Sequence, residues 1–275
     1  MHCFHSADNL LSRRAGQFMF PKRSLAATLD SRNLDLLRAV AVSCVLGAHL
    51  LLCLVDEKVL HIASYDLWKW GTNELGHLGV LFFFVHTALV LMLSLERTPR
   101  AGMIVNFYLR RIFRIYPLSI ACIALVLLLH IPQVPDASYS GWQWSEIASN
   151  LLLIQNITRR ADVITPLWTL PREFQMYLVL PFIFLLLQRF RSSLAVLILW
   201  FGFFAAVPSM PLLSCFPCFM GGVFAYQLAR ERTFRLPSRT WPMAIALLLA
   251  AHVLAMATIL PDYRSDYMLC MFLGA

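Results

Sequence analysis

The stretch LLRAVAVSCVLGAHLLLCLV (residues 36–55) is apolar along almost its whole length, with one arginine near its start and one histidine near its far end. An α-helix rises 1.5 Å per residue, so about 20 residues cross the hydrocarbon core of a bilayer. The stretch therefore predicts a membrane-crossing helix. Arg38 and His49 lie roughly 16 Å apart along its axis.

Further apolar segments follow at similar length. The chain is 59% hydrophobic and only 14% charged, with a mean hydropathy of +0.67, which excludes an ordinary soluble domain. We expect an all-α fold, a polytopic transmembrane helix bundle of about seven to eight crossings. The other predicted crossings are residues 75–95, 115–131, 174–188, 193–208, 211–229 and 241–260, with one more beginning near Tyr267.

The domain organisation predicted from these segments is simple. Residues 1–35 form a basic cytoplasmic N-terminal tail, and residues 36–275 form one transmembrane domain without internal repeats. The last apolar segment stops after about nine residues, less than half a crossing. We therefore expect either a chain truncated at its C-terminus or a last helix completed by another chain, as in a homo-oligomer.

Lysine and arginine are unevenly distributed around the crossings. With a cytoplasmic N-terminus, 17 of the 23 basic residues lie on the inner side, which predicts this orientation in the membrane. The orientation requires that residues 147–157 do not cross, and eleven residues are too few to span. We expect a re-entrant or interfacial helix there, on the outer side. The same distribution explains the net charge of +8 without a nucleic-acid partner.

Two ionisable residues are expected in the outer half of the membrane. His49 cannot reach water as Arg38 can, and such a side chain marks a functional site or a hydrogen bond to a neighbouring helix. Glu173 stands just before the apolar run 174–188, on the same side, as a partner for His49 or as a solvated charge paired with Arg172. His77 and His86 lack a third ligand at helical spacing, so no metal site is expected.

Four stretches in order resemble motifs of the bacterial integral-membrane acyltransferases of family 3, which O-acylate cell-surface sugars. A later glycine-bearing helix resembles the family too. In its second motif this chain has Leu81 where the family usually has aspartate, and Thr87-Ala88 where it has serine-glycine; in the fourth, Arg172 precedes Glu173. The stretches are LDLLRAVAVSCVLGAH (34–49), GVLFFFVHTALVL (79–91), FYLRRIFRIYPL (107–118), PLWTLPREFQMYLVLP (166–181) and FPCFMGGVFAY (216–226).

The resemblance implies an enzyme whose donor is an acyl-CoA, most often acetyl-CoA, whose acceptor is a sugar or polysaccharide, and which holds no bound cofactor. Transfer to a hydroxyl needs a base with a pKa near 7, which suits a histidine. His49 acts as general base or accepts the acyl group itself; Glu173 orients the imidazole and stabilises its charged form or binds acceptor hydroxyls, and Arg38 guides the donor. The predicted catalytic residues are thus His49, Glu173 and Arg38, and the predicted substrate-binding residues are Arg110, Arg111, Arg114, Trp168 and Tyr177.

Each of these roles has a structural alternative. Basic residues gather at the inner side of any membrane protein, so Arg110, Arg111 and Arg114 need not bind CoA phosphates. Trp168 is also placed as an interfacial anchor. Two other functions compete: a transporter or flippase, which the absence of paired broken helices in the sequence disfavours, and a catalytically inactive truncated remnant.

Overall fold

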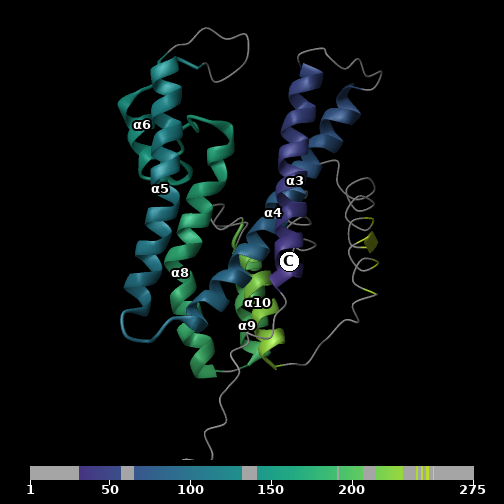
Figure 1. Cartoon of the computed structure of the whole chain (residues 1–275), viewed down its shortest axis with the longest axis vertical. Helices are drawn as coiled ribbons and strands as arrows, with labels where there is room; N and C mark the ends of the chain where they lie inside the picture. Colours follow the sequence, from purple (N-terminus) through teal and green to yellow (C-terminus); the bar gives the residue numbers. More distant parts are fainter. Residues whose placement is uncertain are drawn as a thin grey trace, which may run out of the picture.

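The computed structural model describes residues 31–56, 65–131, 141–190, 192–206 and 215–231, with a few single positions between 240 and 250. Every regular element in these ranges is a helix (Figure 1), which confirms the all-α prediction there. The elements are α3 (Ser31–Asp56), α4 (Tyr65–Arg97), α5 (Met103–Leu129), α6 (Trp144–Leu151), α7 (Gln155–Thr158), η1 (Thr165–Trp168), α8 (Thr169–Phe190), α9 (Ser193–Ala206) and α10 (Phe216–Glu231).

Four of the described helices are long and apolar enough to cross a membrane. They are Leu34–Leu54, Gly71–Arg97, Met103–Leu129 and Pro166–Arg189, and Ser193–Phe203 is a shorter apolar helix. The predicted crossing at 241–260 lies outside the described residues apart from isolated positions, as does the one from Tyr267. The count of seven to eight crossings therefore stays a prediction, and so does the structure of the tail up to residue 30.

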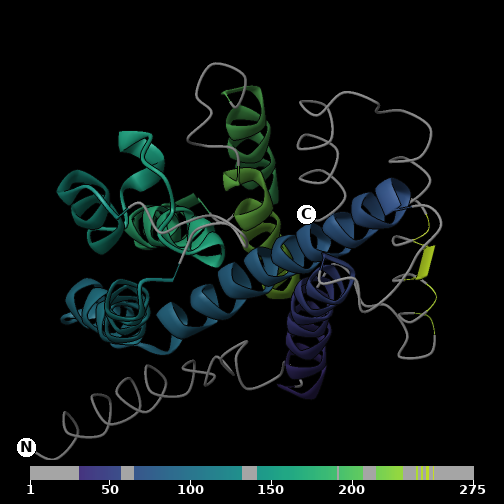
Figure 2. The same cartoon turned by 90° about the horizontal axis from the view of Figure 1, so that it is seen from above.

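Helix α4 is the central element. It runs obliquely across the molecule (Figure 1). Seen from above, α3 lies on one flank of α4 and α9 and α10 lie on the opposite flank, while α5, α6 and α8 gather near one end of it (Figure 2). It packs against α3, α10 and α8. Its apolar window is 61% buried, against 11% for that of α3 and 22% for that of α5. Helices α3, α8 and α10 are therefore arranged around α4.

Small residues allow α4 to approach its neighbours closely. A Cβ atom on Gly79 would lie 2.7 Å from the backbone oxygen of Ala41, and one on Gly76 would lie 3.1 Å from the Cβ of Ala48. On α10, a Cβ on Gly222 would overlap the backbone oxygen of Val85 in α4. Lipid provides no hydrophobic driving force between helices, so close backbone packing at such residues holds a membrane bundle together.

The segment 147–157 does not form one continuous helix. It contains the end of α6 and most of α7, with a break at Leu153, whose φ of 56° is left-handed. Neither helix is long enough to span, as predicted from its length. Asn150 is fully buried: its amide donates to the carbonyls of Glu146 and Ala161, and its oxygen accepts from the Val163 amide. Asn150 thereby ties α6 to the loop that leads into α8.

Two helix boundaries differ from the sequence prediction. Helix α5 begins at Met103, so the basic motif 107–118 lies inside a helix and not in a cytoplasmic connection. Helix α8 begins at Thr169, so Glu173 lies more than one turn inside it and not just before it. Hydropathy places a boundary where charges appear, whereas arginine and glutamate are good helix formers and continue the helix.

Gly222→Ala tests the packing of α10 on α4. The added methyl group would overlap the Val85 backbone, which cannot move as a side chain does, so we expect a loss of stability of about 1–3 kcal/mol. The measurement is the thermal unfolding midpoint of the full chain in detergent. Gly202→Ala in α9 is the control, because a Cβ there meets no atom within 4 Å among the described residues. Equal midpoints for the two variants would contradict close α10–α4 packing.

Candidate functional site

A buried carboxyl group lies inside α8. Glu173 is 8% exposed, and the hydroxyl of Tyr177, one turn further on the same face, donates a hydrogen bond to its Oε1. Arg111 and Arg114 of α5 lie close enough for their charges to act on this carboxyl. A charge buried among apolar helices is stable only when it is hydrogen-bonded and near opposite charge, and Glu173 has both.

The three arginines predicted to bind the donor do not behave alike. Arg110 and Arg114 are exposed, whereas Arg111 is half-buried, with its guanidinium carbon 5.7 Å from the ring centroids of both Phe107 and Tyr177. Its Nε is buried without a hydrogen-bond partner among the described residues. Arg111 is therefore the one that faces the Glu173–Tyr177 pair.

His86 is a buried polar residue that the sequence analysis did not include in the site. It lies on α4, is 7% exposed, and faces the start of α3, where the Leu34 backbone and the charges of Asp35 and Arg38 act on its ring. The charge of Arg114 reaches it as well. The structure thus brings Arg38 and Arg114 to one histidine. In the sequence His86 could be noticed as a histidine inside an apolar run, directly before Thr87-Ala88, where the family it resembles has serine-glycine.

His49 lies on a different level of α3. It is exposed, and it follows Ala48, the residue that faces Gly76 of α4. His49 therefore lies at about the same height along the α3–α4 pair as His77, which follows Gly76 in α4. Within the described part of the chain no hydrogen bond joins His49 to Glu173, whose partner is Tyr177. The pairing of these two residues stays a prediction.

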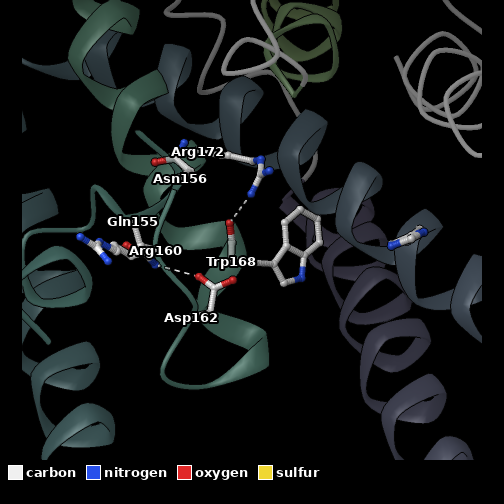
Figure 3. Close-up of a pocket in the computed structure, with 7 residues that line it drawn as sticks. Gln155, Asn156, Arg160, Asp162, Trp168 and Arg172 are labelled. Carbon is white, nitrogen blue, oxygen red and sulfur yellow. Dashed lines mark hydrogen bonds between the residues drawn. The ribbon is translucent and has the colours of Figure 1, made fainter. Parts of the chain in front are cut away.

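A polar pocket lies beside this level, between α4, α7 and the start of α8. Its volume is about 310 Å³, and Figure 3 shows Asp162 and Arg172 close to Trp168, with the Arg160 side chain extending away from the indole. Trp168 contacts His77 edge to face, with ring centroids 6.3 Å apart. Of the predicted substrate-binding residues the pocket contains Trp168; the full lining is His77, Gln155, Asn156, Arg160, Asp162, Trp168 and Arg172.

Hydrogen bonds fix most of the lining side chains. The Gln155 amide donates to Asp162 Oδ1 at 3.1 Å, and Arg172 donates to the Trp168 carbonyl at 2.6 Å (Figure 3). The Arg172 guanidinium also lies 4.9 Å from the centre of the indole ring. Asn156 exchanges two hydrogen bonds with Gln175 of α8, at 3.2 and 3.0 Å. The pocket is consequently preformed, which lowers the cost of ordering it around a ligand.

Asp162 is the acidic member of the pocket. Partial burial raises the pKa of its carboxyl above the usual range, and the hydrogen bond from Gln155 and the charge of Arg172 oppose that rise. A carboxyl whose pKa is higher in the folded protein binds more protons than in the unfolded chain, so the free energy of unfolding rises as the pH falls through that pKa.

Asp162→Asn tests this assignment. The asparagine oxygen still accepts from Gln155 while the disfavoured charge is gone, so we expect a higher unfolding midpoint than wild type at pH 7. The difference should shrink as the pH is lowered and Asp162 in the wild type becomes protonated. The control is Glu146→Gln, because glutamine also completes the capping box of α6. A variant that is less stable than wild type at pH 7 would contradict the burial of this charge.

These features describe a membrane helix bundle with a buried ionisable cluster and a polar pocket. The sequence profile described as the acyltransferase domain, family 3, matches residues 31–275, and the chain belongs to that family. The acyltransferase MdmB of Streptomyces mycarofaciens is 31% identical over 167 residues, which are 58% of this chain and 39% of that protein. The chain thus matches about two fifths of this relative's length. No solved structure matches the chain.

Tyr177→Phe tests the hydrogen bond that holds Glu173. Removing the hydroxyl leaves a buried carboxyl without its donor, and we expect a loss of about 1–3 kcal/mol in stability. Thermal unfolding in detergent measures it. Tyr116→Phe is matched to it, since the Tyr116 hydroxyl has no hydrogen bond among the described residues and its ring likewise packs edge to face. If both variants unfold like wild type, the Tyr177 hydroxyl does not support Glu173.

Proposed function

We propose that the chain is a membrane-bound O-acyltransferase that moves an acyl group, in the first instance acetyl, from cytoplasmic acyl-CoA to a hydroxyl of a cell-surface or lipid-linked sugar. The observation that carries the proposal is the buried Glu173 carboxyl, with Tyr177 donating to it and Arg111 alongside, in a chain of the acyltransferase domain family. Ionisable groups kept inside a membrane protein despite their cost mark functional sites.

In the proposed reaction His49 removes the proton from the acceptor hydroxyl. The hydroxyl oxygen then attacks the thioester carbonyl, the carbon–sulfur bond breaks, and the CoA sulfur leaves with the proton from the imidazolium. In the covalent variant the imidazole nitrogen attacks the thioester carbonyl and CoA leaves as a thiolate; the acceptor hydroxyl then attacks the acyl-imidazole, loses its proton to the CoA thiolate and frees the imidazole. Either route needs the imidazole deprotonated at the start.

The positions of the arginines support a route by which the acyl-CoA donor enters at the end of the bundle opposite the pocket. Arg111 and Arg114 lie on α5 beside Glu173, and Arg38 lies beside His86 on the inner half of α3 and α4 in the proposed orientation. Guanidinium groups bind phosphates in a bidentate manner, and CoA carries several. Arg38 and Arg114 then guide the donor, and Glu173, held by Tyr177, orients the His49 imidazole and stabilises its protonated form.

The cellular setting belongs to the same proposal. The chain crosses the inner (plasma) membrane several times, with its N-terminus in the cytoplasm, because most basic residues then lie inside. The donor enters from the cytoplasm, and the acceptor is presented on the opposite face.

The test is transfer of radiolabelled acetyl groups from acetyl-CoA to the surface polysaccharide of the host, in membranes that contain the full chain. We expect label with wild type and at least about a 100-fold lower rate with His49→Ala, since a general base contributes 10²–10⁴-fold. His130→Ala, at the C-terminal end of α5, is the histidine control at matched expression. Undiminished transfer by His49→Ala would rule out its role, and no transfer by wild type would favour a transporter or an inactive remnant.

A further inference from the structure

The amide oxygen of Gln155 is buried with no hydrogen-bond partner among the described residues. The residue is 1% exposed, and its amide nitrogen is already bonded to Asp162. Gln155 lines the pocket of about 310 Å³ described above. Buried polar atoms in proteins are nearly always paired, so an unpaired acceptor at a pocket wall indicates that a bound donor, such as a hydroxyl group, completes it.

The arginines of the pocket, unlike Gln155, require a ligand that accepts hydrogen bonds. Arg172 uses one nitrogen on the Trp168 carbonyl, and its other N–H groups have no hydrogen bond among the described residues. Arg160 lines the same pocket and is exposed. A ligand here must therefore both donate, to Gln155, and accept, from Arg160 and Arg172. Hydroxyl groups do both.

The charge of the pocket is not balanced. Two guanidinium groups, Arg160 and Arg172, line the pocket with one carboxylate, Asp162, while the Glu74 carboxylate lies outside the lining, 4.0 Å from His77 Nδ1. Trp168 adds an apolar wall, one face of which the Arg172 guanidinium covers. A sugar ring whose hydroxyl groups are accompanied by one anionic group matches these features together.

We propose that this pocket binds a glycosyl unit that carries one anionic group, a carboxylate or a phosphate, and that it recognises the acceptor. The proposal rests on the proposed function, because it locates the acceptor of that reaction. The pocket's His77 follows Gly76, which faces Ala48 of α3, and His49 follows Ala48. The bound sugar would thus lie on the level of the predicted catalytic histidine.

Binding is measured by saturation-transfer NMR on the full chain in lipid nanodiscs, with four probes: D-glucuronate, D-glucose 6-phosphate, methyl α-D-glucopyranoside and inorganic phosphate. We expect at least one of the two acidic sugars to bind about tenfold more tightly than the neutral glucoside and than phosphate alone. The tighter of the two identifies the anionic group as carboxylate or phosphate.

Variants assign the binding to this pocket. Arg160→Gln should weaken the acidic sugar about tenfold and leave the neutral glucoside unchanged, while Arg159→Gln, the same change at a neighbour outside the lining, should alter neither. Gln155→Leu should weaken both sugars, because it removes the acceptor oxygen. Arg160 is exposed, so its replacement does not endanger folding, and unfolding midpoints verify this for every variant.

The proposal is overturned if no sugar binds, if neutral and acidic sugars bind equally, if phosphate alone binds as tightly as the sugar phosphate, or if Arg159→Gln and Arg160→Gln act alike. Its failure can be told apart from failure of the proposed function. Acetyl transfer with no sugar bound in this pocket refutes the pocket alone. Sugar binding without acetyl transfer supports the pocket and counts against acetyl transfer to the host polysaccharide.

Discussion

The close approach of α4 to α3 and α10 is the constraint on which the remaining structure depends. At Gly79 and Gly222 the helix backbones lie so near one another that a single methyl group has no room. In lipid, where apolar side chains gain little by leaving the solvent, such contacts replace the hydrophobic effect as the determinant of helix position. Because α3, α8 and α10 all pack against α4, the placement of the polar groups on α4 follows from these contacts.

Helix α4 carries its two histidines to two different polar regions. His86 faces Arg38 and the cluster around Glu173, while His77 lies more than two turns away and contacts Trp168 at the pocket. In the proposed function these regions serve the two substrates: the cluster serves the donor, and the pocket serves the acceptor. His49 lies at the height of the pocket on α3, and its side chain is exposed among the described residues.

Much of the fold could be predicted from apolar length alone, because a bilayer of fixed thickness demands helices of fixed length. The four described spans, the short 147–157 segment and the family all followed from the sequence. Boundaries were less accurate: arginines in α5 and Glu173 in α8 interrupt hydropathy without interrupting a helix. The burial of the Glu173 carboxyl was not predicted. Hydropathy treats it as a boundary charge, whereas the hydrogen bond from Tyr177 and the charges of the neighbouring arginines make its burial tolerable.

The sequence by itself determined the class of protein, the membrane helices and the residue types available for acyl transfer, since composition and local spacing carry that information. Tertiary structure alone decided that His86 faces Arg38, that Arg111 and not Arg110 faces Tyr177, and that Gln155, Asp162 and Arg172 share one pocket. These relations join residues on different helices and loops. They depend on the angle and depth at which α4 meets its neighbours. Steric contact between the backbones sets that angle and depth, and no periodicity within one segment encodes them.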